Sequence, residues 1–278
     1  MTIRIVTDST GDLPVDVAER HGIGVVPIYI NIGEESYLDG IDISREDFYA
    51  RLPDLNPAPT TALPGPALFL QTYQRLIDEG ATEILSVHIS RELSGVVDMA
   101  KLAAQDVPVP VTVVDSGSLS LGLGFLAQAA AEAAAGGASM AEILALVEDQ
   151  RRRTHVFAML DTLEFLRRSG RMNRVLATVG GWLHLKPLLK MTDGSATAER
   201  ILSGEASVRR LLALLEEALP LERVALVHTH ALARAQALRD RARHLLPPGD
   251  VLSVDITPVL GAHLGPGAVG FACVTGTG

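Results

Sequence analysis

Three apolar runs of strand length, Ile3–Val6, Ile84–Ile89 and Val111–Val114, each end abruptly in hydroxyl and carboxylate side chains. In an open parallel sheet the carboxyl ends of the strands meet at one edge, and ligands bind in the crevice outside that edge. The sequence therefore predicts a pocket floor that is rich in hydroxyl groups. The polar residues that follow these runs include Asp8, Ser9, Ser94 and Ser116.

A proline-rich loop holds two further hydroxyls. Residues 52–66 contain five prolines, which exclude a regular helix or a central strand, and Thr60 and Thr61 lie at the centre of this stiff segment. Hydroxyl groups can bind a carboxylate or phosphate oxygen without a fixed positive charge, because hydrogen bonds to an anion are roughly twice as strong as neutral ones. Thr61 and Ser94 are therefore candidate anion-binding residues. The alternative interpretation is a surface connection with incidental threonines and ordinary turn serines.

An arginine and a histidine are candidates for the same site. Arg171 follows Gly170, which should end a helix, so that its side chain could project into a cleft. His263 lies in the glycine-rich stretch 261–267, where the absence of side chains allows backbone and imidazole to approach a ligand closely. Together they suit a phosphate or an acyl phosphate. Taken alone, each could equally be a surface arginine or a loop histidine.

Catalytic and metal-binding alternatives have weaker support. Ser94, Asp115 and His263 occur in the chain order of one kind of hydrolase triad, but the nucleophile elbow G-x-S-x-G is absent around Ser94. His228 and His230 alternate at a strand end, without a third ligand at a spacing typical of metal sites. Neither a dinucleotide fingerprint nor a Walker loop is present. We therefore predict no catalytic residue, no metal and no cofactor, and a chain that does not bind ATP itself.

Composition limits the classes of protein further. With 278 residues, 47% of them hydrophobic and 21% charged, the chain is typical of a globular protein of two domains. Its net charge of −9 argues against nucleic acid as a partner. The single cysteine, Cys273, excludes an intramolecular disulfide. Apolar stretches too short for a membrane span, and a start that lacks a signal sequence, predict a cytoplasmic protein without stable membrane insertion.

Strand and helix patterns alternate regularly up to about residue 155 and less regularly beyond it, so we place a domain boundary there, between domains 1–155 and 156–278. Further expectations concern single elements. They are a helix capped by Asp12, one strand over Ile23–Ile32, a helix begun by Ser44, a helix over Phe125–Ala135, a capping box of Ser139 and Glu142, a helix over 175–185, and a hairpin over Leu188–Arg200 with Asp193-Gly194 as its turn.

Seven motifs follow one another along nearly the whole chain. They are IVTDSTGDLP, VVPIYI with a Tyr-x-Asp-Gly turn, ISRELSG, VVDSGSLSLGLG, LDTLEFLRRSGRM, LKPLL and HLGPGAVG. In this order they specifically resemble the DegV family, whose members are fatty-acid-binding proteins and, where studied, the lipid-presenting subunit of a bacterial fatty acid kinase.

The resemblance implies an α/β protein with a two-domain DegV-like fold: an N-terminal three-layer α/β/α domain with a parallel sheet, a C-terminal α/β domain with a mixed sheet, and a long-chain fatty acid in the cleft between them. It implies that Thr61 and Ser94 bind the carboxylate, and that Arg171 and His263 lie beside the head group, where they contact the phosphate or the kinase. Asp8, Ser9, Gly95 and Ser116 would belong to the supporting pocket loops.

The implied function is non-catalytic: the protein presents the bound carboxylate to a separate ATP-dependent kinase for acyl-phosphate formation. A small-molecule phosphotransferase or a Ser94-dependent hydrolase is the alternative. The chain departs from the family pattern at the head group. It has Thr61-Ala62-Leu63-Pro64-Gly65 in place of T-S-Q-P-S, Ser94-Gly95-Val96 in place of S-G-T, and Ser169-Gly170-Arg171 in place of G-G-R, and therefore fewer hydroxyls.

Overall fold

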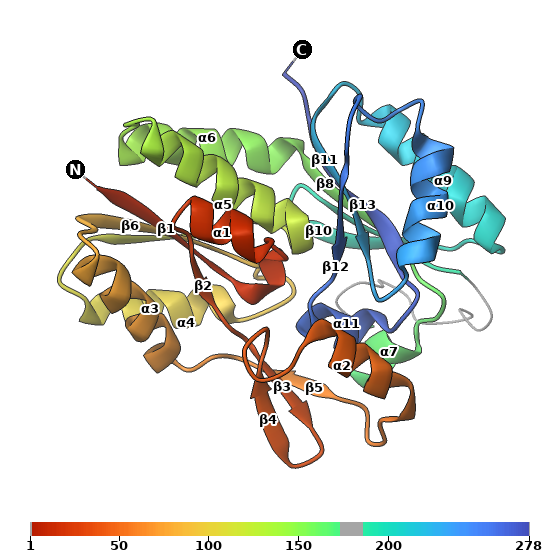
Figure 1. Cartoon of the computed structure of the whole chain (residues 1–278), viewed down its shortest axis with the longest axis horizontal. Coiled ribbons are helices and arrows are strands. Elements are labelled where there is room, and N and C mark those ends of the chain that lie inside the picture. Colours follow the sequence, from red (N-terminus) through yellow and green to blue (C-terminus); the bar gives the residue numbers. More distant parts are fainter. Residues whose placement is uncertain (1, 173–185, 278) are drawn as a thin grey trace.

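The computed structural model describes residues 2–172 and 186–277, which form three β-sheets with helices packed against them (Figure 1). The first sheet has four parallel strands in the order β2-β1-β6-β7. Its strands are nearly continuous apolar runs, as expected for a sheet covered on both faces. They are β1 (Ile3–Asp8), β2 (Gly24–Val26), β6 (Glu83–His88) and β7 (Val111–Asp115).

The second sheet has six strands in the order β10-β9-β8-β13-β11-β12. It is mixed, because β11 and β12 pair in parallel and its other neighbouring strands pair antiparallel. Strands β9 and β10 form the predicted hairpin, with the turn at Asp193 and Gly194. The strands are β8 (Thr154–Met159), β9 (Leu188–Thr192), β10 (Ser195–Glu199), β11 (Leu221–His228), β12 (Leu252–Asp255) and β13 (Val269–Thr275).

The third sheet is small and antiparallel, with the order β4-β3-β5, and it comprises β3 (Tyr29–Ile32), β4 (Glu35–Leu38) and β5 (Thr60–Ala62). The prediction of one strand over Ile23–Ile32 is wrong. The chain leaves the four-stranded sheet after Val26 and enters the small sheet at Tyr29, because Pro27 cannot donate a backbone hydrogen bond to a continuing ladder. Strand β5 lies at an edge, which fits the prolines around it.

Helices separate and cover the two larger sheets (Figure 1). The pair α3 and α4 packs on one face of the four-stranded sheet, α5 packs on its other face and also on the six-stranded sheet, and α9 and α10 pack on that sheet's far face. The helices are α1 (Val15–Arg20), α2 (Arg45–Arg51), α3 (Pro66–Asp78), α4 (Val96–Ala103), α5 (Ser120–Ala135), α6 (Met140–Arg153), α7 (Glu164–Arg168), α9 (Gly204–Glu217), α10 (Leu232–Ala242) and α11 (Pro258–Leu264), with short 3-10 turns at Ser9–Gly11, Leu52–Asp54 and Ala104–Asp106.

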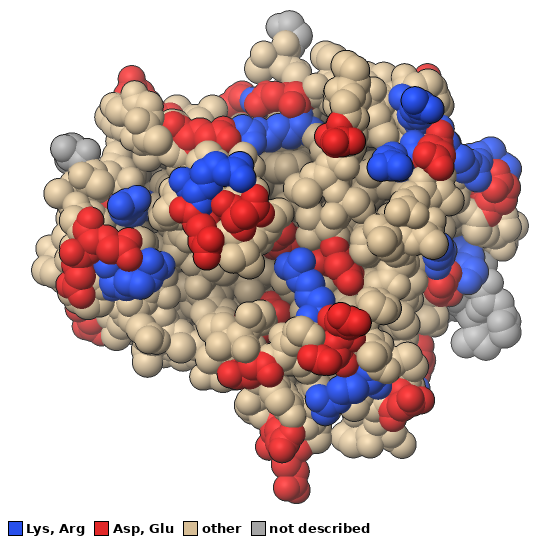
Figure 2. Space-filling view, viewed as in Figure 1, with Lys and Arg blue, Asp and Glu red and all other residues tan. Residues whose placement is uncertain are grey.

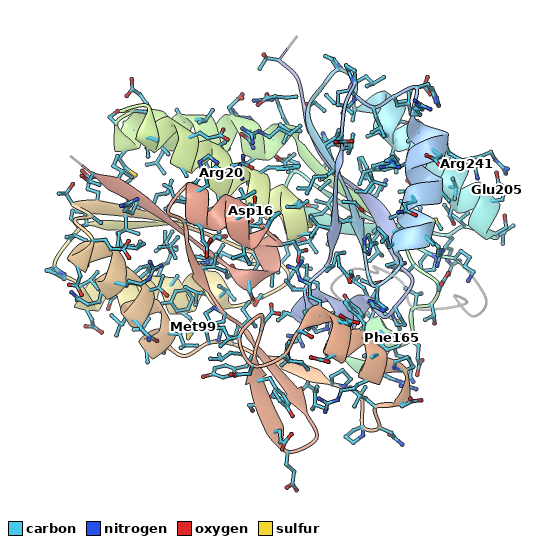
Figure 3. All side chains as sticks on the ribbon, in the orientation of Figure 1. Asp16, Arg20, Met99, Phe165, Glu205 and Arg241 are labelled. Carbon is cyan, nitrogen blue, oxygen red and sulfur yellow. The ribbon has the colours of Figure 1, made fainter. Side chains whose placement is uncertain are left out.

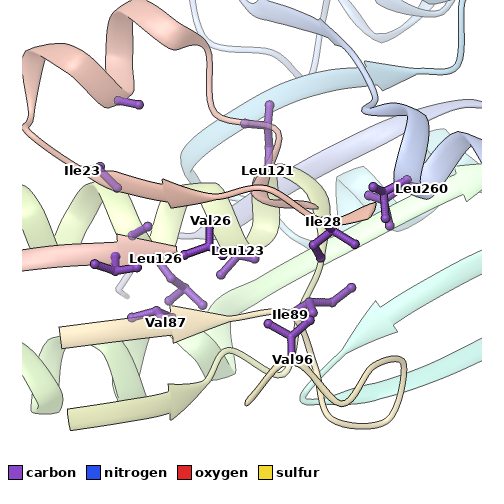
Figure 4. Close-up of a cluster of buried hydrophobic side chains, with 14 of the residues drawn as sticks. Ile23, Val26, Ile28, Val87, Ile89, Val96, Leu121, Leu123, Leu126 and Leu260 are labelled. Atoms are coloured by element: carbon purple, nitrogen blue, oxygen red, sulfur yellow. The ribbon is translucent and has the colours of Figure 1, made fainter. Parts of the chain in front are cut away.

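Small residues allow α5 to lie between two sheets. A Cβ atom on Gly122 would lie 2.7 Å from the Val156 side chain on the six-stranded sheet. On the other side, Leu121, Leu123 and Leu126 belong to the same buried cluster as the strands of the four-stranded sheet (Figure 4). The main hydrophobic core is therefore continuous across both sheets. The division into domains 1–155 and 156–278 stays a prediction; the chain enters the six-stranded sheet at Thr154.

Helix boundaries differ from the prediction at three places. Helix α5 begins at Ser120, five residues before the predicted start, and α11 occupies much of the stretch predicted as a loop around His263. Asp12 does not begin α1, whose N-cap is Pro14. It ends the 3-10 turn Ser9–Gly11 and is buried in a left-handed conformation, where its carboxylate accepts hydrogen bonds from Ser120 Oγ (2.6 Å) and the Thr257 N–H (2.7 Å). Tertiary packing decides all three. The predicted helix over 175–185 lies outside the described residues.

Local capping signals are confirmed. Ser44 accepts a hydrogen bond from the Asp47 N–H at the start of α2, and Ser139 and Glu142 form a complete capping box at the start of α6. At the surface, ion pairs such as Asp16–Arg20 and Glu205–Arg241 lie along and between helices (Figure 3). On the face shown in Figure 2, Lys and Arg side chains are scattered among Asp and Glu side chains. Such exposed pairs contribute little to stability.

A buried carboxyl beside the junction of the sheets gives a testable pH effect. Asp39 is 4% exposed, and this burial raises the pKa of its carboxyl to about 7. Since the folded state then binds the proton more tightly than the unfolded state, the stability from Asp39 is present below pH 4 and is lost as pH rises to 7. Asp39→Asn should raise the free energy of unfolding at pH 8, by on the order of 4 kcal/mol, and change it little at pH 4.

Urea unfolding of both proteins at the two pH values measures this difference. The exposed Asp54→Asn variant is the control and should show no such pH dependence. An equal effect of Asp39→Asn at pH 4 and pH 8 would contradict the explanation by burial of charge.

Candidate functional site

A cavity lies where the carboxyl ends of the parallel strands face the six-stranded sheet. Thr10 follows β1, Ile89 and Ser94 follow β6, and Leu119 follows β7, so the three loops predicted from the strand ends all reach it. The opposite wall comes from β8, β9, β10, β11 and α11. The cavity volume, counted as the space that the centre of a water molecule can occupy, is about 150 Å³. That is roughly ten times the space that one water needs.

Most of the side chains that line the cavity are aliphatic, and none of the described ones is a Phe, Tyr or Trp. Aliphatic walls without these large rings fit a flexible hydrocarbon chain rather than a planar ligand. The aliphatic lining residues are Ile28, Ala62, Leu63, Ile89, Leu93, Leu119, Val156, Ala158, Leu166, Leu189, Met191, Ala196, Val227, Ile256, Val259, Leu260 and Leu264.

The four head-group candidates, Thr61, Ser94, Arg171 and His263, all line this cavity. Thr61 Oγ1 lies 3.1 Å from His263 Nε2, although the two residues are 202 positions apart. Thr61 comes from β5, which pairs with β3, and His263 comes from the last turn of α11. The structure thus brings the predicted residues together, while their binding roles stay a prediction.

Electrostatics distinguishes the histidine from the arginine. Burial, and to a lesser extent the positive charge of Arg171, lower the pKa of His263 to about 3, so the imidazole is neutral at physiological pH. Its Nδ1 atom is buried and has no hydrogen-bond partner among the described residues. Arg171, whose Nη1 donates to the Ser169 carbonyl (3.0 Å), brings a positive charge, while the ammonium of the other basic lining residue, Lys190, is paired with Glu199 (2.7 Å). The site therefore combines a neutral imidazole and hydroxyl groups with one guanidinium, a set of groups suited to a carboxylate.

A buried polar network fixes two of the loops. Asp8 Oδ2 lies 3.0 Å from His88 Nδ1 and accepts a hydrogen bond from the Ile89 N–H (3.0 Å), while Oδ1 accepts from the Thr10 N–H (3.1 Å). His88 was not among the residues predicted from the sequence. The available signal was a histidine inside an apolar strand, which must find a partner when it is buried.

The other supporting residues hold loops in place, and none of them is among the described residues that line the cavity. Ser9 Oγ accepts a hydrogen bond from the Ile28 N–H (3.2 Å), which anchors the link between β2 and β3. Ser116 Oγ accepts from the Ser118 N–H (3.0 Å). Gly95 precedes α4, and a Cβ atom there would lie 3.1 Å from the Leu63 side chain. With Asp8, these residues shape the loops beneath the site.

The alternative constellations do not assemble. The Asp115 carboxylate accepts hydrogen bonds from the N–H groups of Gly117 (2.9 Å) and Arg91 (3.3 Å), whereas His263 Nε2 contacts Thr61, so Ser94, Asp115 and His263 do not form a hydrogen-bonded triad. In residues 2–172 and 186–277 there is no group of three or more His, Cys, Asp or Glu side chains that could hold a metal ion. No helix in the same ranges is both long and apolar enough to cross a bilayer.

The part of the cavity wall that the six-stranded sheet supplies was not predicted. Val156, Ala158, Met191 and Val227 lie on strands of the six-stranded sheet and face the three loops. In the sequence they are ordinary buried-strand residues, and nothing in the pattern separates a side chain that lines a cavity from one that fills a core.

Comparison with known proteins identifies the family. The model for an uncharacterised protein family, DegV, matches residues 2–276. A DegV domain-containing protein of Streptomyces coelicolor is 38% identical over 273 residues, covering 96% of each chain. Among solved structures, this chain is similar to a DegV family protein from Thermus thermophilus for which fatty acid binding is described. The two share 35% identity with a TM-score of 0.90, over 99% of this chain and 100% of that one. DegV of Bacillus subtilis, described as a fatty acid binding protein, has 28% identity and a TM-score of 0.89 over 99% and 100%. The resemblance and the fold expected from the motifs are confirmed: the chain belongs to the DegV family.

Proposed function

We propose that this protein binds a long-chain fatty acid, with the acyl chain in the aliphatic cavity and the carboxylate at Thr61 and Ser94. One observation carries the proposal: a cavity walled by aliphatic side chains includes hydroxyls, a neutral imidazole and a guanidinium among its lining residues. The fatty acid binding described for the Thermus and Bacillus proteins supports it.

The energetics of this proposal are favourable. Burying about 15 methylenes at roughly 0.8 kcal/mol each contributes on the order of 12 kcal/mol before the ordering costs of binding. Thr61 and Ser94 would donate hydrogen bonds to the carboxylate oxygens. Thr61 Oγ1 would at the same time accept a hydrogen bond from His263, whose neutral imidazole would carry its single N–H on Nε2. The apolar chain thus supplies most of the affinity, and the polar groups fix the orientation.

We further propose that the protein is a non-catalytic subunit that presents the carboxylate to a separate ATP-dependent kinase in the cytoplasm. A carboxylate oxygen would attack the γ-phosphorus of ATP bound to the partner, ADP would leave, and the acyl phosphate would remain in the cavity. On this proposal Arg171 faces the new phosphate or the kinase, and His263 lies beside the head group. The neutral state of His263 fits a hydrogen-bonding role rather than a charge-pairing role.

Native mass spectrometry of the purified protein tests the central claim. We expect a complex heavier than the chain by the mass of one long-chain fatty acid, and the same acid in an organic extract. A protein that stays ligand-free after incubation with palmitate and oleate would refute the proposal. Turnover of ester substrates by the isolated protein would instead favour a hydrolase.

A further inference from the structure

The hairpin of β9 and β10 forms one wall of the cavity although it lies at the edge of its sheet. Five of its residues line the cavity: Leu189, Lys190, Met191, Ala196 and Thr197. Among the described residues, strand β10 pairs with β9 alone, and β9 joins the sheet through β8. Displacing the hairpin would break the β8–β9 pairing and leave the other ladders of the sheet intact, so contacts beyond the ladder help to hold this wall.

On the outer side of the hairpin, Arg210 of α9 pairs with Glu199 at the end of β10 (2.9 Å). Another contact comes from the opposite side of the cavity. The Glu92 carboxylate accepts a hydrogen bond of 3.0 Å from the Ala196 N–H, a backbone donor on the edge strand. Glu92 stands two residues before Ser94, in the loop after β6. The loop that brings the candidate head-group serine to the cavity is therefore bonded directly to the wall that encloses the acyl chain.

A second contact holds the tip of the hairpin. A Cβ atom on Gly117 would lie 3.0 Å from the Gly194 Cα, so the loop after β7 and the hairpin turn touch with no room for a side chain at Gly117. The Arg151 side chain lies beside both glycines. These van der Waals contacts are weaker and less directional than the bond from Glu92, which is assisted by the carboxylate charge.

We propose that Glu92 is a positioning residue for the fatty acid: its bond to Ala196 keeps the β9–β10 hairpin closed over the acyl chain, and displacement of this hairpin is the route by which the chain enters and leaves. The inference rests on the proposed function. The loop after β6 would then have two roles: Ser94 contacts the carboxylate, and Glu92 holds the opposite wall.

The test is the exchange kinetics of a naturally fluorescent long-chain fatty acid, cis-parinaric acid, measured by stopped flow in both directions. Replacing Glu92 by Ala removes the carboxylate, and we expect association and dissociation each to become about tenfold faster, with the dissociation constant changed less than threefold. Glu92→Gln keeps a neutral acceptor and should fall between the two. Glu216→Ala, at an exposed glutamate on α9, is the matched control and should exchange like the wild type.

The outcomes separate the possibilities. Faster dissociation with unchanged association would mean that Glu92 only stabilises the bound state, and the hairpin route would be wrong. Unchanged rates in both Glu92 variants would also overturn the inference. If the wild-type protein does not bind cis-parinaric acid, palmitate or oleate at all, the proposed function itself fails. Thermal unfolding of Glu92→Ala detects a folding defect. If there is one, the exchange rates of Glu92→Gln alone decide whether Glu92 holds the hairpin closed.

Discussion

Replacing Ala158 by Phe should abolish tight fatty acid binding while the protein remains folded. Ala158 lies on β8, is 8% exposed and faces the cavity, so that a phenyl ring there occupies space that the acyl chain needs. Excluding about four methylenes at roughly 0.8 kcal/mol each removes about 3 kcal/mol of binding free energy. The dissociation constant should therefore be roughly 100-fold higher. Fluorescence titration with cis-parinaric acid measures it.

The ring should fit because the cavity gives it room, and phenylalanine is well tolerated in strands. Ala237→Phe, at an exposed position of α10, is the matched control and should bind like the wild type. Circular dichroism and thermal unfolding establish that Ala158→Phe is folded. A folded Ala158→Phe protein with wild-type affinity would show that the acyl chain lies elsewhere.

Arg171→Ala should separate binding from phosphorylation. The guanidinium lines the cavity near His263, but on our proposal the aliphatic walls supply most of the affinity, so the variant should retain the fatty acid. Phosphoryl transfer by the kinase should fall at least 100-fold, since arginine at such a position stabilises charge on the transferring phosphoryl group. The measurement is acyl-phosphate formation from labelled ATP in the presence of the proposed kinase partner.

Two further variants sharpen this experiment. Arg171→Lys keeps a charge without the planar fork and should recover only part of the rate. Arg167, four residues before Arg171, is an exposed arginine on α7 that pairs with Glu164. Arg167→Ala should leave the rate unchanged. Loss of fatty acid binding in Arg171→Ala would refute the assigned role, because the residue would then be needed to hold the ligand.

The polar half of the site was predictable because its residues interrupt local patterns. Ser94 follows a buried strand, Thr61 lies in a segment that prolines exclude from a regular helix or a central strand, and Arg171 follows a helix-ending glycine. Hydroxyls and charges at such places need an explanation. The positions of the strand ends predicted that the loops after the parallel strands would lie at one edge of the sheet. The motif order supplied the pairing of Thr61 with Ser94, which no single pattern implies.

The apolar half was not predictable for the opposite reason. Val156 and Met191 satisfy the ordinary rules for buried strands, so periodicity cannot tell a cavity wall from a filled core. Tertiary contacts also overrode local signals in α11, where Gly261 lies directly against the Tyr49 ring and the helix continues through a glycine that would otherwise favour a loop. The break at Pro27 was visible in the sequence, but its strand was assigned by hydrophobicity alone.

The position of α5 limits how this molecule can deform. Because one helix is wedged against β1 and β6 on one side and β8, β11 and β13 on the other, a clamshell motion about a hinge would have to strip it from one of its two partners. Because α5 is buried against both larger sheets, the two sheets should move together as one rigid unit. If the protein binds a fatty acid as we propose, the acid should enter by displacement of a peripheral segment rather than by separation of the two sheets. A larger residue at Gly122 should disturb the packing of α5 against the six-stranded sheet.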